Sequence, residues 1–139
     1  MRIVFDTNIY LASLKAGSLS FQILELIVEE VSGYFLYISP DLKSELFDKL
    51  DKWEKEEVVN LKSVERLKSL IKNFIAVAIP REKITQIIDD PDDDKVLECA
   101  VAAKANVIVT MDKHPLKLKT FRNIAIVHPN IFKHLSSRE

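Results

Sequence analysis

The sequence contains a single cysteine, Cys99, so its 139 residues cannot form an internal disulfide. This is typical of proteins from a reducing compartment, and we expect a cytoplasmic location. Glycine and proline are also scarce, with two and five residues, and no Gly/Ser-rich or low-complexity stretch marks a linker. Since 47% of the residues are hydrophobic, the chain has enough apolar surface for its own core. We therefore expect residues 1–139 to form a single domain.

A large excess of one charge is missing as well, because 20 Lys and Arg residues are balanced by 21 Asp and Glu residues. The net charge of −1 argues against a strongly basic nucleic-acid coat and against a polybasic membrane anchor. Residues 1–8 hold three consecutive apolar residues before an aspartate, too few for a signal peptide, which we therefore do not expect. No stretch has the length of a membrane span, so we expect no membrane partner.

Five short apolar runs are candidate β-strands. They are continuous rather than alternating, as expected for strands of a parallel sheet that is buried on both faces. The runs cover residues 3–5, 34–38, 76–79, 107–109 and 124–127.

Helical patterns separate these runs. Apolar residues recur at helical spacing in residues 21–31, which Gly33 is placed to end, and again in 42–53 and 64–74. Segment 95–104 is small and apolar on most sides, so we expect a helix that is buried against the sheet. Strands that alternate with helices predict an α/β fold, a three-layer sandwich around a central parallel sheet of about five strands.

Acidic residues follow the predicted strands on the side where an open parallel sheet binds its ligands, outside the carboxyl ends. Asp6 directly follows the first strand, and Asp112 comes shortly after the fourth. Glu45 lies on the helix after the second strand, about 60° from Leu42 and so on the flank of its apolar stripe. Asp94 opens the buried helix. Four carboxylates from four separate segments are thus predicted to converge on one edge.

Each acid also has a structural interpretation. Asp6 is equally suited to cap a helix, Glu45 taken alone is more typical of a solvated helix face, and Asp112 suits a turn. The run that precedes Asp94 is typical of capping and helix-dipole chemistry, and we keep this interpretation for its other acids. Those acids are Asp89, Asp90, Asp92 and Asp93. The structural interpretations need a separate reason for each acid, whereas one bound cation explains the whole set. Carboxylates that cluster repel one another, and a divalent cation between them offsets this repulsion.

The donor types indicate which ion and which chemistry suit this set. Carboxylates without thiolates favour hard cations such as Mg²⁺ or Mn²⁺, and no Cys or His spacing suits zinc. His114 lies beside the proposed site, where a structural interpretation outweighs a functional one. The sequence has no phosphate-binding glycine loop and no nucleophile elbow, which excludes the usual nucleotide and acyl-transfer enzymes. An acid-lined Mg²⁺ site serves phosphoryl chemistry.

The same residues carry a resemblance to a known family. Asp6-Thr7-Asn8 follows an apolar strand, Glu45 lies six residues past Ser39, and Thr110-Met111-Asp112 ends eighteen residues after Asp94. In this order and spacing the chain resembles the PIN-domain nucleases along essentially its whole length. The similarity is greatest to PIN domains of VapC-type toxins, the toxin components of toxin–antitoxin pairs, in the stretch that runs from residues 90–95 to residues 110–113.

The resemblance implies a Mg²⁺- or Mn²⁺-dependent endoribonuclease on a five-stranded parallel sheet, often a homodimer. Asp6, Glu45, Asp94 and Asp112 would form its catalytic, metal-binding set, although the fourth acid varies in such families. Asn8 and Thr110 would orient carboxylates or substrate. A slip of one or two positions would exchange Asp94 for Asp93 or Asp92, and the spacing to Asp112 favours Asp94.

Partners and alternatives follow from the same resemblance. We expect an RNA substrate, held by the metal and by a local rim that includes Lys95 and Lys113, and a cognate antitoxin protein that covers the acids. The lysines are equally consistent with an ordinary solvated surface. Two other functions remain open: an RNA-processing nuclease that is not a toxin, and a non-catalytic module that binds a metal or a partner.

Overall fold

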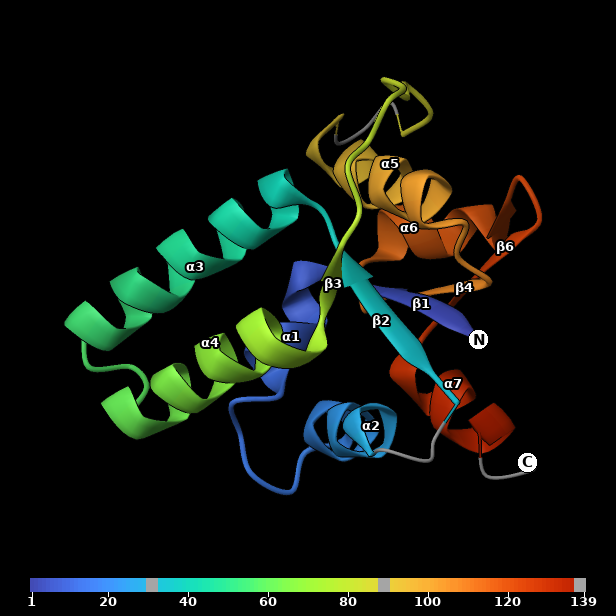
Figure 1. The fold of residues 1–139 in the computed structure, drawn as a ribbon. Helices are drawn as coiled ribbons and strands as arrows, with labels where there is room; N and C mark the ends of the chain where they lie inside the picture. Colours follow the sequence, from blue (N-terminus) through green and yellow to red (C-terminus); the bar gives the residue numbers. More distant parts are fainter. Residues whose placement is uncertain (30–32, 88–90, 137–139) are drawn as a thin grey trace.

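The computed structural model describes residues 1–29, 33–87 and 91–136. Val31 of the predicted helix and the acids Asp89 and Asp90 lie outside this part of the chain. Within the described residues the chain forms a six-stranded sheet in the order β3-β2-β1-β4-β6-β5 (Figure 1). The strands are β1 (Arg2–Phe5), β2 (Phe35–Ile38), β3 (Ala76–Val77), β4 (Val107–Val109), β5 (Thr120–Phe121) and β6 (Ile124–Val127).

The predicted α/β sandwich with a mostly parallel central sheet is confirmed. All five predicted strands are present and pair in parallel. The sixth strand, β5, was not predicted and pairs antiparallel with β6. Its hairpin turns at Arg122 and Asn123, both with positive φ (48° and 67°). Two such residues are typical of a type I′ turn, which usually carries glycine, and without that glycine the sequence gives no hairpin signal.

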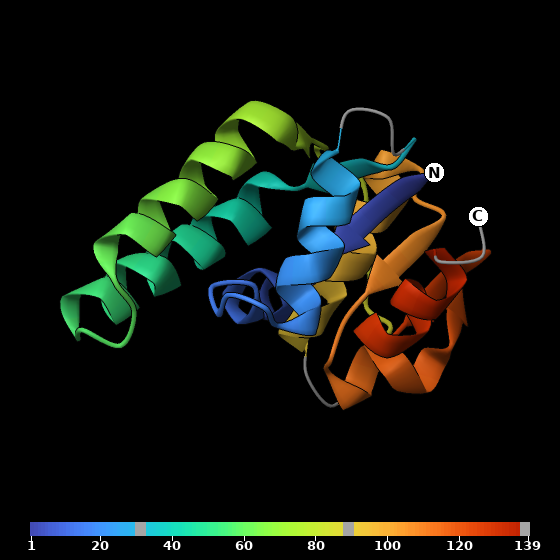
Figure 2. The same ribbon diagram turned by 90° about the horizontal axis from the view of Figure 1, so that it is seen from below.

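Helices cover both faces of the sheet, as Figure 1 shows. Helix α5 packs on β1, β2 and β4, with α6 on the same side; α1, α2 and α7 lie on the other side. Helices α3 and α4 lie antiparallel and extend away from the sheet (Figure 2). The helices are α1 (Thr7–Ala12), α2 (Leu19–Val28), α3 (Pro40–Lys55), α4 (Leu61–Phe74), α5 (Asp94–Ala103), α6 (Lys113–Leu118) and α7 (Pro129–Ser136), with a short 3₁₀ turn, η1 (Pro91–Asp93), before α5.

The core explains why these segments form these elements. Strand β1 buries Ile3, Val4 and Phe5 completely, as a central strand covered on both faces should. Helix α5 buries apolar residues around most of its circumference, which confirms the prediction of a helix packed into the core. The stripes of α3 and α4 are buried along each helix, with the end residue Phe74 exposed, so these two are core helices. Among the described residues, no helix is both long and apolar enough to cross a membrane.

The strand register places the site. Phe5 of β1 pairs with Val109 of β4, and Val109 pairs with Val127 of β6. The N–H of Asp6 donates to the carbonyl of Val109 at 3.0 Å, so the pairing continues one residue past β1. Because the two neighbouring strands end at the same level, the residues that follow them meet at one edge of the sheet.

Candidate metal centre

A hydrogen-bonded network joins the ends of β1 and β4. The Thr110 hydroxyl donates to Oδ2 of Asp6 at 2.8 Å, and the oxygen of this hydroxyl accepts the backbone N–H of Asp112 at 3.0 Å. Thr110 is completely buried, and Asp6 is 9% exposed. This hydroxyl therefore fixes both the Asp6 carboxylate and the backbone that leads to Asp112.

Asn8 closes the network from α1. Its Nδ2 lies 3.5 Å from Oδ2 of Asp6 and 3.5 Å from the Thr110 oxygen, and its Oδ1 accepts the N–H of Met111 at 3.3 Å. The structure thus brings Asn8 and Thr110 directly to Asp6. Oδ1 of Asp6 also accepts the N–H of Thr7 at 2.8 Å, so Asp6 caps α1 as well. Asp6 can therefore be both a helix cap and a member of the acidic site, because Oδ1 caps α1 and Oδ2 belongs to the network with Thr110.

Burial raises the pKa of Asp6 above its ordinary value, because the ionised carboxylate loses water. The hydrogen bonds from Thr110 and Thr7 lower that pKa, whereas the negative charges of Asp112 and Glu45 raise it further. Glu45 is exposed on α3 and still acts on Asp6 through its charge. Three of the predicted acids are therefore close enough to interact electrostatically.

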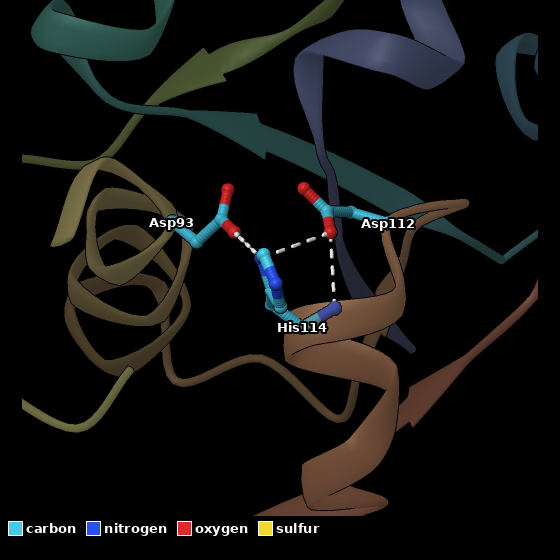
Figure 3. A group of neighbouring side chains, drawn as sticks. All are labelled: Asp93, Asp112 and His114. Atoms are coloured by element: carbon cyan, nitrogen blue, oxygen red, sulfur yellow. Dashed lines mark hydrogen bonds and ion pairs between the residues drawn. The ribbon is translucent and has the colours of Figure 1, made fainter. Parts of the chain in front are cut away.

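A second group lies on the other side of Asp112 (Figure 3). Oδ1 of Asp112 accepts the N–H of His114 at 3.0 Å and so caps α6. Nδ1 of His114 lies 3.4 Å from Oδ2 of Asp93 and 3.7 Å from Oδ1 of Asp112. One donor atom from each of the three residues lies within 4.8 Å of the others. Asp112 thus belongs to this Asp93–Asp112–His114 group and is also joined through its backbone N–H to the Asp6 network.

Asp94 has a different environment. Its Oδ1 accepts the backbone N–H groups of Gln86 at 3.1 Å and Ile87 at 2.8 Å, and the residue is 4% exposed. One turn later, Glu98 accepts the N–H of Ile84 at 2.9 Å. These two acids fasten segment 84–87 to α5. The structure therefore brings Asp93, and not Asp94, to Asp112 and His114.

The two lysines proposed as a rim differ in their surroundings. Lys113 is exposed at the start of α6, directly after Asp112. Lys95 is half-buried, and its Nζ lies 3.7 Å from Oδ1 of Asp92. Of these two lysines, Lys113 is therefore the more exposed beside the acids.

Comparison with known families matches residues 2–114 to the PIN domain. The chain belongs to the PIN domain family. The matched range includes every acid described above, and PIN domains are generally nucleases, which cut phosphodiester bonds.

The fold is also similar to a chain in the crystal structure of VapBC2 from Rickettsia felis bound to a DNA fragment from their promoter. The TM-score is 0.63 at 16% sequence identity, and the match covers 92% of this chain and 98% of that one. At this identity the likeness establishes the PIN fold. None of the curated proteins compared with the chain matches it.

The donor set of this PIN domain fits a divalent cation. Asp6, Asp93 and Asp112 offer carboxylate oxygens from three separate segments, and Glu45 adds a fourth negative charge nearby. Like charges gathered at a partly dehydrated edge repel one another, so a cation would relieve a real electrostatic cost there. Asp94 fits less well, because one of its oxygens already accepts two backbone hydrogen bonds.

Sequence reasoning preferred Asp94, with Asp93 as an alternative, and gave His114 a structural interpretation. Three consecutive aspartates, Asp92 to Asp94, lie at the start of α5, and neighbouring helical residues point about 100° apart, so a shift of one position changes which acid faces the site. For His114 the usable signal was its spacing from Asp112. An Asp that caps a short helix brings the side chain two residues later back to the same helix start, as Figure 3 shows.

Proposed function

We propose that this PIN domain is a divalent-metal-dependent endoribonuclease. The observation that supports this proposal is the position of Asp112 at the carboxyl edge of the sheet. Asp112 lies in one group with Asp93 and His114, and its charge acts on Asp6 together with that of Glu45 on α3. In this proposal Asp93 takes the role that spacing alone gave to Asp94. A Mg²⁺ or Mn²⁺ ion bound there would offset the charge of a phosphodiester and lower the pKa of an attacking water.

The chain itself supplies orientation. Thr110 and Asn8 hold the Asp6 carboxylate in one position, and the Thr110 hydroxyl also fixes the backbone N–H of Asp112. Preorganised groups of this kind need no rearrangement when substrate arrives. We assign Lys113, and more weakly Lys95, to contacts with RNA phosphates at the rim of the site.

The biological role we propose is that of a toxin whose antitoxin covers the acidic edge. Support comes from the VapC-like spacing of the acids and from the fold shared with a chain of the VapBC2 structure. A protein of this kind works in the cytoplasm and often forms a homodimer, which light scattering on the purified protein tests. A short reading frame next to the gene supports the toxin; an isolated gene favours an RNA-processing nuclease.

The decisive experiment incubates the purified chain with single-stranded RNA and Mn²⁺ or Mg²⁺, with and without chelator. We expect internal cleavage that chelator abolishes and products with 5′-phosphate and 3′-hydroxyl ends. Asp6→Asn and Asp112→Asn should be inactive, whereas Asp48→Asn, an exposed acid on α3, should cut normally. Ends with a 2′,3′-cyclic phosphate would contradict attack by water. A folded, metal-binding protein that cuts no RNA would instead be the non-catalytic module.

A further inference from the structure

The histidine in the Asp93–Asp112–His114 group has no role in an all-oxygen metal site. Both its backbone and its ring are nevertheless placed beside the two carboxylates. The backbone N–H of His114 donates to Oδ1 of Asp112, and its ring points to the space between the two carboxylates (Figure 3). The ring comes from α6, Asp93 from the turn before α5, and Asp112 from the end of the β4 segment. Three separate elements thus present one donor atom each to a common point.

The spacing of these atoms suits ligands of one ion. Two ligands with metal bonds of about 2.1 Å can be at most about 4.2 Å apart. Nδ1 of His114 meets this limit with both partners, at 3.4 Å from Asp93 and 3.7 Å from Asp112. All three atoms lie within 4.8 Å of one another, so a small rotation of one carboxylate completes the set.

The contacts of Nδ1 fit a ligand better than a hydrogen-bond donor. The atom is buried and makes no hydrogen bond to the described residues, although two carboxylates lie close by. A buried ring nitrogen that served only to bridge two acids would be expected to make at least one such bond, because leaving it unmade is costly. A cation between the three atoms would use the nitrogen lone pair and both carboxylates at once.

We propose that His114 is a nitrogen ligand of the cation, together with Asp93 and Asp112, and that it makes this PIN domain select Mn²⁺ and Co²⁺ over Mg²⁺. Imidazole binds first-row transition ions well, whereas Mg²⁺ prefers oxygen ligands and keeps its waters. The inference rests on the proposed metal site and goes beyond it, because it names the atom that sets ion choice.

The test measures metal binding directly. Isothermal titration of the full chain with Mn²⁺, Co²⁺ and Mg²⁺, each as the chloride, gives three affinities for the wild type, His114→Ala and His114→Asn. We expect both variants to lose about tenfold or more in affinity for Mn²⁺ and Co²⁺ and to keep Mg²⁺ binding. The matched control is His134→Ala, an exposed histidine on α7, which should bind all three ions like the wild type.

A second measurement can be made on the wild type and covers the case in which His114→Ala fails to fold. Pulsed electron paramagnetic resonance of the wild-type protein loaded with Mn²⁺ should show coupling to one imidazole nitrogen, and folded His114→Asn should lack it. Absence of nitrogen coupling in the wild type would overturn the proposal. Equal weakening of Mg²⁺ and Mn²⁺ binding in the variants would overturn the selectivity.

These outcomes are distinct from failure of the proposed function. A protein with nitrogen-coupled Mn²⁺ that cuts no RNA would refute the nuclease and retain the His114 ligand. A protein that cuts RNA with Mn²⁺ held only by oxygen would refute the ligand and retain the nuclease.

Discussion

The two aspartates at the start of α5, Asp93 and Asp94, are neighbours in sequence and differ in what balances their charge. Asp94 accepts two backbone N–H groups and fastens segment 84–87 to the helix. Asp93 faces His114, with Asp112 just beyond it. Fixed backbone amides stabilise an ionised carboxylate permanently, whereas a neighbouring carboxylate raises the free energy of the ionised form, a cost that a bound cation would lower. We conclude that Asp94 holds α5 to segment 84–87, whereas Asp93 lies at the proposed metal site.

Glu98 extends this contrast along the helix. It lies one turn after Asp94 and accepts the N–H of Ile84, while the side chains of Ile84 and Ile87 are buried. The attached segment therefore combines apolar contacts with hydrogen bonds to two acids. This arrangement stabilises α5 at the end that carries Asp93, so the hydrogen bonds of Asp94 and Glu98 support the position of the site.

The largest predicted difference between the two acids is in catalysis. Asp93→Asn should reduce RNA cleavage by a factor on the order of 100 or more, because it removes a negative ligand from the reacting centre. Asp94→Asn should cut RNA at nearly the wild-type rate, since an amide oxygen can still accept both backbone hydrogen bonds. Initial rates of RNA cleavage by the two variants and the wild type, at saturating Mn²⁺, test this prediction. An inactive but folded Asp94→Asn alongside an active Asp93→Asn would reverse our assignment and restore the one based on spacing.

The second prediction concerns stability, for which we expect Asp94 to matter more than Asp93. Asp94→Ala should lower the free energy of unfolding by about 1–3 kcal/mol, because the N–H groups of Gln86 and Ile87 lose their buried acceptor. Asp93→Ala should change it much less, and in metal-free protein should hold or slightly raise it by removing one of several like charges. Urea unfolding in the presence of chelator measures both. Equal losses for the two variants would show that Asp93 also has a structural role.

The third prediction concerns Asp6, which caps α1 and also belongs to the proposed metal site. It concerns how the stability of the protein depends on pH. Its folded-state pKa is raised by burial, so the folded protein binds the proton more tightly than the unfolded chain. The resulting stability is fully present below the unfolded pKa of about 3.9 and is lost as the pH rises through the folded pKa. Each unit between the two pKa values corresponds to about 1.4 kcal/mol.

Metal-free Asp6→Asn should therefore lack this fall in stability with rising pH. The slope of stability against pH is the right measurement, because the amide also alters the hydrogen bond from Thr110 and shifts the absolute value. Parallel slopes for wild type and variant would show that the hydrogen bonds from Thr110 and Thr7 cancel the effect of burial on the Asp6 pKa.

The same contrast explains what sequence can and cannot predict here. Continuous apolar runs such as Ile3-Val4-Phe5 have one stable environment, a strand covered on both faces, so the sheet was predictable. The hairpin at Arg122 and Asn123 was not, because its positive φ values are imposed by the antiparallel pairing and not by glycine. The network of Asp6 follows from strands that end at one level. The choice between Asp93 and Asp94 depends on the residue at which α5 begins, and capping chemistry cannot resolve one position within a run of aspartates.

The smallest predicted effect contrasts two lysines that flank the acids. Lys113 is exposed beside Asp112, and if it contacts an RNA phosphate, Lys113→Gln should lower the slope of log affinity against log salt by about 0.7. Lys95 is half-buried next to Asp92, so Lys95→Gln should change the slope less. Binding is measured with the cleavage-inactive Asp6→Asn background at several salt concentrations, and Lys55→Gln at the far end of α3 is the control. An unchanged slope for Lys113→Gln would mean that its charge is simply solvated, leaving the metal site as the main attraction for the phosphate backbone.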